Sequence, residues 1–293
     1  MYWLLICNDE KKLQAAENAV STAFGEQKIC RISQNKNLLK EFSMVKSAVT
    51  HCIVSAEKMT EALEFAVGCL CGAGVPVITD IHELDERAKL FETILTKKDF
   101  SGVLAYLQEN KDTIAAASQK KEAFSYLFEH GIPFTADCFA GYIEKENIDL
   151  CRRYVQAGMN VDVRDSDGTP MLNIACRCEN FALVEWLVSC GCNIDPVSED
   201  RGYTPLMDAV WKGNLEIASF LIQHGADVNR LSKDGQTMIV LAVGADKIDL
   251  CRLLVENGAD VDIPDAMGMS AYGYAALFKK SEILSILEKY HKE

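Results

Sequence analysis

The sequence has no long apolar run and no excess of positive charge. No stretch approaches the length of about 18 consecutive apolar residues that a membrane-spanning helix needs. The apolar start, residues 1–7, ends at the polar run beginning with Asn8, and it lacks the basic start and longer apolar stretch of a secretory signal. Acidic residues number 43 against 30 lysines and arginines, so the net charge is −13. Because negative charge repels phosphates and anionic headgroups, we expect neither a nucleic acid nor a membrane as a partner.

Several ligand-binding signatures are also missing. Neither a Gly-x-Gly-x-x-Gly motif nor a P-loop is present, and the five histidines do not have the spacing of metal ligands. Three Cys-x-Cys pairs occur among the twelve cysteines, but structural zinc sites usually have two residues between paired ligands. With no export signal, we interpret the cysteines as reduced thiols of a cytoplasmic protein. We therefore expect no metal and no cofactor.

A glycine-containing motif recurs along the second half of the chain. A second series of glycines, at positions 168, 202, 235 and 268, keeps a fixed phase with it, and an alanine follows each of these glycines at position 175, 209, 242 or 275. Two phases locked over four copies indicate a structural repeat. The copies of the first motif are Gly158-Met-Asn-Val-Asp162, Gly191-Cys-Asn-Ile-Asp195, Gly225-Ala-Asp-Val-Asn229 and Gly258-Ala-Asp-Val-Asp262.

Each fixed position of this repeat has a physical reason. The closing glycine suits the end of a helix, where a left-handed residue costs least without a Cβ. Pairs such as Asp167-Gly168 suit a tight turn. Apolar residues at helical spacing follow, for example in residues 215–222 and 248–255. The pattern therefore predicts pairs of helices joined by turns, one pair to each repeat.

The best copy identifies the kind of repeat. Residues 202–214 read Gly-Tyr-Thr-Pro-Leu-Met-Asp-Ala-Val-Trp-Lys-Gly-Asn, which resembles the ankyrin-family pattern G-x-T-P-L-H-x-A-A-x-x-G-H. Only Thr204-Pro205 keeps the Thr-Pro signature in register, and Met207 replaces the usual histidine. The resemblance covers residues 134–293 and implies an all-α ankyrin-repeat solenoid. We expect residues 82–133 to form degenerate helical repeats that cap it.

The same resemblance implies a binding function. Ankyrin arrays generally have no chemistry of their own and bind proteins through their finger tips and inner helices. At the position of Trp211, the neighbouring repeats carry Arg177, Gly244 and Leu277, so this is not a uniform core site. Trp211 either anchors an interface or packs over a neighbouring helix. Carried over position by position, the candidate protein-binding residues are Arg177, Arg201, Tyr203, Asp208, Trp211 and Lys212.

Residues 1–81 have a different pattern. Apolar runs alternate with helical segments, which predicts an α/β domain with a small parallel sheet of Rossmann-like (flavodoxin-like) type. The expected strands are 3–7, 29–32, 51–54 and 75–78, and the expected helices are 10–24, 36–47 and 58–72. Ligands of such folds bind at the carboxyl ends of the strands. The candidate residues for such a cleft are Asn8, Asp9, Ser55, Glu57 and Asp80.

Two short stretches of this domain resemble known families. Residues 61–68, followed by Gly74-Val-Pro76, look like the helix–strand segment of nucleoside deoxyribosyltransferases and TIR-type NAD hydrolases. In both families a helix-borne glutamate acts on a glycosidic bond, and Glu64 is the match; an ordinary exposed glutamate is the alternative. The acidic residues that follow the first strand resemble those of receiver domains, but Ser55 stands where their phosphoacceptor aspartate should be.

Three hypotheses follow from these patterns. In the first, the chain is a cytoplasmic adaptor whose ankyrin surface binds a protein. In the second, it is a two-part effector whose N-terminal domain binds or hydrolyses a nucleoside or NAD-like ligand. In the third, the sheet is only a structural cap. The effector hypothesis requires a pocket near the strand ends that contains Glu64 or Glu57.

Overall fold

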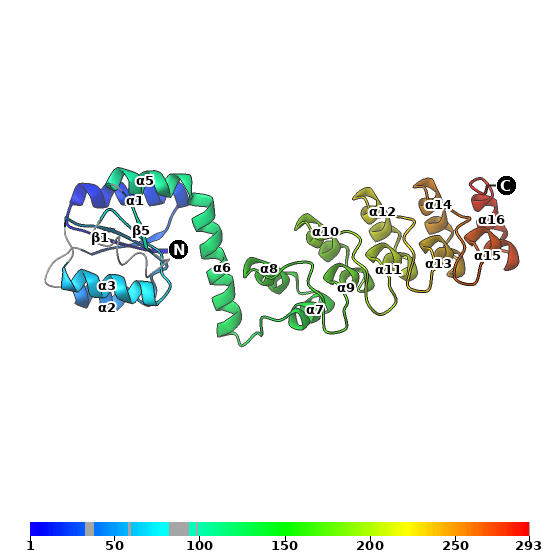
Figure 1. Cartoon of the computed structure of the whole chain (residues 1–293), viewed down its shortest axis with the longest axis horizontal. Helices are drawn as coiled ribbons and strands as arrows, with labels where there is room; N and C mark the ends of the chain where they lie inside the picture. Colours follow the sequence, from blue (N-terminus) through cyan, green and yellow to red (C-terminus); the bar gives the residue numbers. More distant parts are fainter. Residues whose placement is uncertain (33–37, 58–59, 82–93, 98, 293) are drawn as a thin grey trace. The chain divides into compact units, whose positions relative to one another are not determined.

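The structure is a computed structural model in which two compact units are distinguished, Met1–Lys121 and Glu122–Glu293 (Figure 1). It describes residues 1–32, 38–57, 60–81, 94–97 and 99–292. Each unit has hydrophobic core clusters of its own.

The first unit contains a parallel sheet of five strands. The strands are β1 Tyr2–Cys7, β2 Lys28–Ile32, β3 His51–Ser55, β4 Val77–Thr79 and β5 Ile94–Thr96. Their order is β2-β1-β3-β4-β5, and every neighbouring pair is parallel. This is the strand order of flavodoxin-type doubly wound sheets, in which the direction of winding changes between β1 and β3. The parallel sheet expected from the sequence is confirmed.

Helices cover both faces of the sheet, as Figure 1 shows. Helices α1 (Glu10–Phe24) and α5 (Phe100–Glu109) lie on one face, and α2 (Leu38–Val45) and α3 (Glu61–Gly72) lie on the other. The side chains of β1 alternate between the two cores: Leu4 and Ile6 join the cluster of α2 and α3, while Trp3, Leu5 and Cys7 join that of α1 and α5. Burial on both sides explains why β1 is an unbroken apolar run.

The expected boundary at residue 81 needs correction. Strand β5 pairs with β4, and α5 packs against α1, so the sheet unit continues well beyond that residue. A strand of three residues is too short to show a period of two in the sequence, and α5 has the same apolar spacing as a repeat helix. Residues 82–93, which the predicted cap included, lie outside the described residues.

The long helix α6 (Lys111–Glu129) crosses from one compact unit into the next. Ile114, near its start, belongs to the core of the sheet unit. Ala123 and Leu127, near its end, belong to the core of the second unit. The two ends of α6 therefore belong to different hydrophobic cores.

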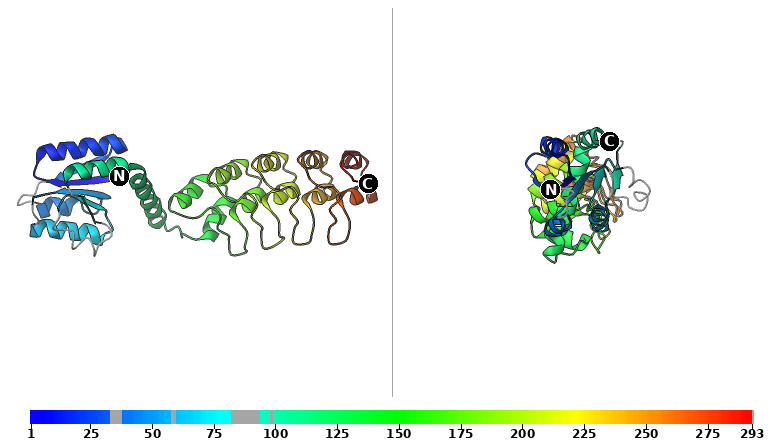
Figure 2. Two further views of the ribbon diagram at one scale, coloured as in Figure 1. Left: turned by 45° about the horizontal axis from the view of Figure 1, so that its top comes forward. Right: turned by 90° about the vertical axis from the view of Figure 1, so that its left-hand side faces the viewer.

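The second unit consists of five helix pairs that follow one another along the chain (Figure 2). First helices contact first helices, from α7 through α9, α11 and α13 to α15, and the second helices α10, α12, α14 and α16 contact one another in the same way. The pairs are α7 Ala136–Glu144 with α8 Ile148–Gln156, α9 Met171–Arg177 with α10 Phe181–Ser189, α11 Pro205–Lys212 with α12 Leu215–Gln223, α13 Met238–Gly244 with α14 Ile248–Glu256, and α15 Ala271–Leu277 with α16 Ser281–Leu287.

The turns have the backbone that their glycines predict. The closing glycines all have positive φ, from 79° at Gly191 to 103° at Gly158. In the fingers, Gly202 also has a positive φ, of 68°, and a Cβ there would lie 2.6 Å from the backbone nitrogen of Lys233 in the next repeat. Gly202 therefore serves both the turn and the close approach of neighbouring fingers.

A ladder of side-chain hydrogen bonds also joins successive repeats. Asp162 Oδ1 accepts from the backbone N–H of Asn193 at 2.8 Å, and Asp195 Oδ2 accepts from that of Asp227 at 3.0 Å. Asn229 Oδ1 accepts from the N–H of Asp260 at 2.8 Å. In the first three copies, the polar residue that ends the Gly-x-x-Val/Ile-Asp/Asn motif thus forms a hydrogen bond to the next repeat, which the sequence pattern alone does not reveal.

Candidate protein-binding surface and strand-end cleft

Three of the six candidate binding residues lie on the surface of the helix pairs. Trp211, near the end of α11, exposes 51% of its area, which is unusual for the largest apolar side chain. Lys212 follows it directly in the sequence, and Arg201, ten residues earlier, is also exposed. The Arg201 guanidinium lies 5.5 Å from the centre of the Tyr203 ring and 3.8 Å from a carboxylate oxygen of Asp200.

Of the other three candidates, Tyr203 and Asp208 are buried and Arg177 is only partly exposed, so the structure does not place these three on an open binding surface. Tyr203 and Asp208 are 7% and 1% exposed. Asn173, also buried, donates from Nδ2 to Asp208 Oδ2 at 2.8 Å and to the Tyr203 carbonyl oxygen at 2.9 Å. Arg177 donates from Nε to Asp208 Oδ1 at 3.0 Å. Because these residues come from α9 and α11, the network ties two repeats together instead of facing a partner.

The guanidinium of Arg177 offsets the negative charge of two carboxylates in this network. Arg177 also donates from Nη2 to Asp200 Oδ1 at 3.1 Å. Burial raises the pKa of the Asp208 carboxyl, and Arg177 and Asn173 offset only part of that effect. For Asp200 burial acts in the same direction, but hydrogen bonds from Arg177 and Ser198 outweigh it and hold the pKa of Asp200 well below its usual range. Arg177 is therefore already committed to two carboxylates.

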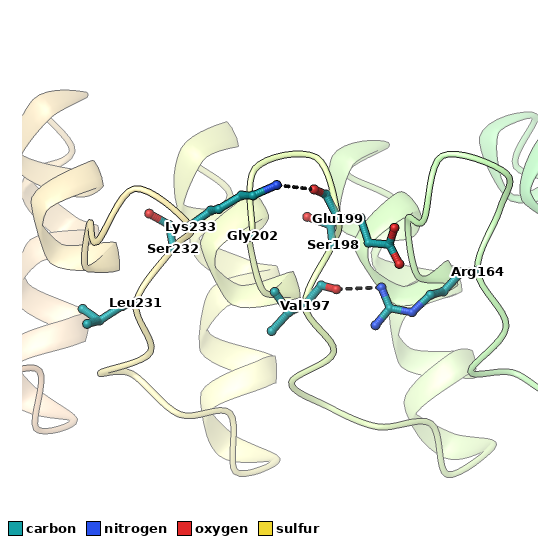
Figure 3. Close-up of a pocket in the computed structure, with 8 residues that line it drawn as sticks. All are labelled: Arg164, Val197, Ser198, Glu199, Gly202, Leu231, Ser232 and Lys233. Carbon is teal, nitrogen blue, oxygen red and sulfur yellow. Dashed lines mark hydrogen bonds between the residues drawn. The ribbon is translucent and has the colours of Figure 1, made fainter. Parts of the chain in front are cut away.

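Two of the cavities on the described part of the second unit lie at its fingers and first helices. The first, of about 560 Å³, runs between successive fingers (Figure 3) and is polar at its rim. There Arg164 donates from Nη1 to the Val197 carbonyl oxygen at 2.7 Å, and Lys233 donates from Nζ to that of Glu199 at 3.2 Å. The cationic side chains of this cavity are thus turned to neighbouring backbone.

The second cavity, of about 390 Å³, lies on the first helices and is lined mainly by apolar groups. Trp211, on α11, and Phe278, at the end of α15, are both more than half exposed and come from the two helices that contact α13 on either side. Sequence reasoning missed Phe278 and Tyr274 here. It had shown only that the position of Trp211 varies between repeats, with Gly244 and Leu277 as its equivalents. The residues lining it are Trp211, Gln236, Val240, Leu241, Gly244, Ala245, Tyr274 and Phe278.

The strand ends of the first unit carry a third cavity, of about 510 Å³. It lies where β1 and β3 end, at the change of winding direction, as the rule for doubly wound sheets predicts. Of the five cleft candidates, Asn8, Asp9, Ser55 and Glu57 line it. Asp80 is not among the lining residues.

Asp80 instead forms hydrogen bonds with two residues that line the cavity, Lys12 and Ser55. Its Oδ2 accepts from Ser55 Oγ at 2.9 Å and from Lys12 Nζ at 3.3 Å, and Lys12 also donates to Ser55 Oγ at 3.0 Å. Sequence reasoning missed Lys12, because nothing in a single sequence shows that a helix side chain reaches back over the sheet. Asp9 is occupied as the cap of α1, since its side chain accepts from the backbone N–H groups of Lys11 and Lys12.

Glu64 does not join this cavity. It lies in the first turn of α3, partly exposed, and is not one of the residues that line the strand-end cavity. Glu57 does line the cavity and is exposed. The geometry therefore separates the one residue that carries the glycosidase resemblance from the cleft that a substrate would occupy.

Among the residues that the structure describes, no helix combines the length and the apolar character needed to cross a bilayer. All twelve cysteines are free thiols.

Family models for ankyrin repeats match the second unit twice. A model of three repeat copies matches residues 139–232, and a model of many copies matches residues 221–275. These ranges begin in α7 and end in α15, so they cover all five first helices at least in part and every second helix except α16.

Similar proteins extend this match. A putative ankyrin repeat-containing protein of Treponema pallidum is 32% identical over 234 residues, which are 77% of this chain and 76% of that protein. Human palmitoyltransferase ZDHHC13 is 34% identical over 155 residues, but these are 49% of this chain and only 25% of that protein. Mouse ankyrin repeat and SAM domain-containing protein 6 is 32% identical over 98 residues, 33% of this chain and 11% of that protein. The chain belongs to the ankyrin-repeat protein family.

Proposed function

We propose that the chain is a protein-interaction adaptor that binds a protein partner through the first helices and fingers of its ankyrin repeats. The observation that carries the proposal is the exposed apolar group on the first helices, in which Trp211, Leu277 and Phe278 are 51%, 62% and 59% exposed. Exposed apolar residues that gather in one place are typical of interaction sites, and tryptophan is among the commonest interface anchors.

The rest of the proposal concerns the setting of this surface. We take the five helix pairs to form a continuous ankyrin solenoid, and we place the protein in the cytoplasm because its twelve cysteines are free thiols. Exposed Lys212, directly after Trp211, and exposed Arg201, in the finger before α11, add positive charge to this surface on a chain of net charge −13. No nucleic acid, membrane or cofactor enters the proposal.

The effector hypothesis is not proposed: Glu57 lines the strand-end cleft, but Glu64, which matches the helix-borne glutamate of the enzymes that cleave glycosidic bonds, does not. The cleft remains a place where a small polar ligand would fit, with Lys12, Ser55 and Asp80 already bonded to one another. In our proposal the sheet unit has no catalytic part.

The proposal is tested by affinity co-purification from a lysate of the source cell. The variant Arg201→Ala/Trp211→Ala is compared with native protein and with a control, Leu215→Ala/Arg252→Ala, which removes a similarly exposed pair from the second helices α12 and α14. Circular dichroism first establishes that all three are folded. We expect a partner that native protein and the control retain and that the variant loses.

Equal recovery of the same partners by all three proteins would contradict this binding surface. If only the control variant lost the partner, the binding surface would lie on the second helices instead. The original candidates Tyr203 and Asp208 are left out of the test, because their substitution would damage the core.

A further inference from the structure

The cavity on the first helices owes its existence to one missing side chain. At the position that is Arg177, Trp211 and Leu277 in other repeats, α13 has Gly244. Gly244 is exposed, and a Cβ placed on it would find no atom within 4 Å. The helix thus leaves an open gap between the Trp211 side and the Phe278 side, which we call the Gly244 socket. Its lining is that of the 390 Å³ cavity described above.

The walls of the Gly244 socket are aromatic and held in place. The rings of Tyr274 and Phe278 are stacked, with centroids 5.9 Å apart and planes 3° from parallel. The Tyr274 hydroxyl donates to Asp265 Oδ2 at 2.7 Å, so its polar end is already occupied. Val240 and Leu241, both buried, lie beneath. Such a site gains most from a large apolar side chain, because rigid aromatic walls lose little freedom on contact.

The rim of the Gly244 socket is basic, unlike the chain as a whole. The helices that line it end at the loops 212–214, 245–247 and 278–280, which contain four lysines and one aspartate. The equivalent loops of the two preceding repeats, 145–147 and 178–180, contain one lysine and two glutamates. The net charge therefore changes from −1 in those two loops to +3 in the three loops around the socket, on a protein of net charge −13.

Some of these lysines are committed and some are available. Lys280 donates from Nζ to the Val243 carbonyl oxygen at 2.7 Å and lies 3.0 Å from Asp246 Oδ1, so it closes the end of α13. Lys247 and Lys279 are exposed, and no ion pair of either is found within the described part of the chain. Lys212 has a loose contact of 3.8 Å with Glu179. A basic rim around an apolar socket selects by charge as well as by shape.

We infer that the Gly244 socket binds an acidic segment of a partner protein, with one large apolar side chain inserted between Trp211 and Phe278 and carboxylates beside Lys247 and Lys279. This inference rests on the proposed function and names the chemistry of the partner that the adaptor surface takes. A second copy of this chain and a partner segment of positive charge are the alternatives that the test separates.

The test uses the full chain and short fluorescent peptides in which a central tryptophan or alanine is flanked by glutamates or by lysines. We expect the glutamate-flanked tryptophan peptide to bind at least about tenfold more tightly than either of the others. Fluorescence anisotropy gives the dissociation constants. Equal affinity for glutamate-flanked and lysine-flanked peptides, or no binding of any peptide, overturns the inference.

Variants then locate the site. Gly244→Leu fills the socket without removing any residue that lines its walls. We expect it to weaken binding of the preferred peptide by about tenfold or more. Gly141→Leu is the matched control, because Gly141 also lies within a first helix and also has open space around its Cβ; it should bind as native protein does. Lys247→Glu/Lys279→Glu should abolish the preference for glutamate over lysine. Unchanged binding by Gly244→Leu overturns the inference.

Two further outcomes separate this inference from the proposed function. If Gly244→Leu still retains the partner that Arg201→Ala/Trp211→Ala loses, the adaptor proposal stands and the socket inference fails. If native protein retains no cellular partner while the peptide preferences hold, the socket stands and the adaptor proposal fails.

If light scattering shows a native dimer that Gly244→Leu converts to a monomer, the occupant is a second copy and the inference of an acidic partner is overturned.

Discussion

At the scale of single residues, His51 is an imidazole whose pKa the fold of the sheet unit shifts strongly. It begins β3, is almost fully buried, and stacks on Trp3 with ring centroids 4.7 Å apart. Its Nδ1 lies 3.1 Å from Thr50 Oγ1. Burial, more than any other cause, lowers the pKa of His51 from 6.5 to about 4. The folded protein therefore holds this imidazole neutral at pH values where the unfolded chain would protonate it.

This shift predicts an acid-sensitive sheet unit. Since the folded pKa lies below the unfolded one, the stability linked to His51 is complete above pH 6.5 and is lost as the pH falls towards about 4. The loss should reach about 3 kcal/mol at the lower end of this range. Urea unfolding of native protein and His51→Gln across the range measures it. A variant with the same pH dependence as native protein would refute the assignment to His51.

At the scale of the element, the turn after each first helix places one residue in the left-handed region. This residue is Gly213 in the best ankyrin copy, with φ 82°, but other residue types take the same conformation in the remaining repeats. A side chain makes this conformation costly, because its Cβ crowds the backbone. The other four residues are Glu146, Glu179, Asp246 and Lys279, with φ between 55° and 60°.

These turns offer a direct way to stabilise the repeats. Glu146→Gly should raise the free energy of unfolding by up to about 1 kcal/mol, because the exposed Glu146 side chain is replaced where the backbone already favours glycine. Glu185→Gly, in the middle of α10 and equally exposed, is the control and should lower it by about 1 kcal/mol. Chemical denaturation of both variants measures the difference. If Glu146→Gly were less stable than native protein, the left-handed backbone at Glu146 would not be a source of strain.

At the scale of the whole molecule, the repeats are joined by more than apolar contact. The ladder of Asp162, Asp195 and Asn229 satisfies a backbone N–H of the next repeat at each step. At the end of the chain, Asp262 takes the same position and accepts from the N–H of Lys292 at 2.9 Å and from His291. The last residues thus complete the pattern where no further repeat follows in this sequence.

Removing one step of the ladder tests how strongly the repeats depend on it. Asn229→Ala leaves the N–H of Asp260 without its partner and also removes the bond from Asn229 Nδ2 to the Gly258 carbonyl oxygen. We expect a loss of about 1–2 kcal/mol in the free energy of unfolding. The neighbouring exposed Arg230→Ala should change it by no more than about 0.5 kcal/mol. Equal effects of the two substitutions would mean that the ladder contributes nothing of its own.

Much of the repeat architecture was predictable because it is local. A closing glycine with positive φ, a finger turn at Gly202 and an apolar face in α12 all follow from contacts within about one repeat length. The sheet was predictable for a similar reason, since a strand buried on both faces, such as β1, shows as an unbroken apolar run. Strand β5 was not, because three residues contain too little pattern.

The sequence by itself determined that the chain has ankyrin repeats after a parallel α/β sheet, since both follow from short-range periodicity. Only the tertiary structure decided which of the candidate binding residues lie at the surface. Tyr203, Asp208 and Trp211 lie within nine positions of each other, yet two of them are buried and one is exposed. The difference arises from side chains more than thirty residues away, where Asn173 and Arg177 take up Asp208, whereas Gly244 leaves the space beside Trp211 open.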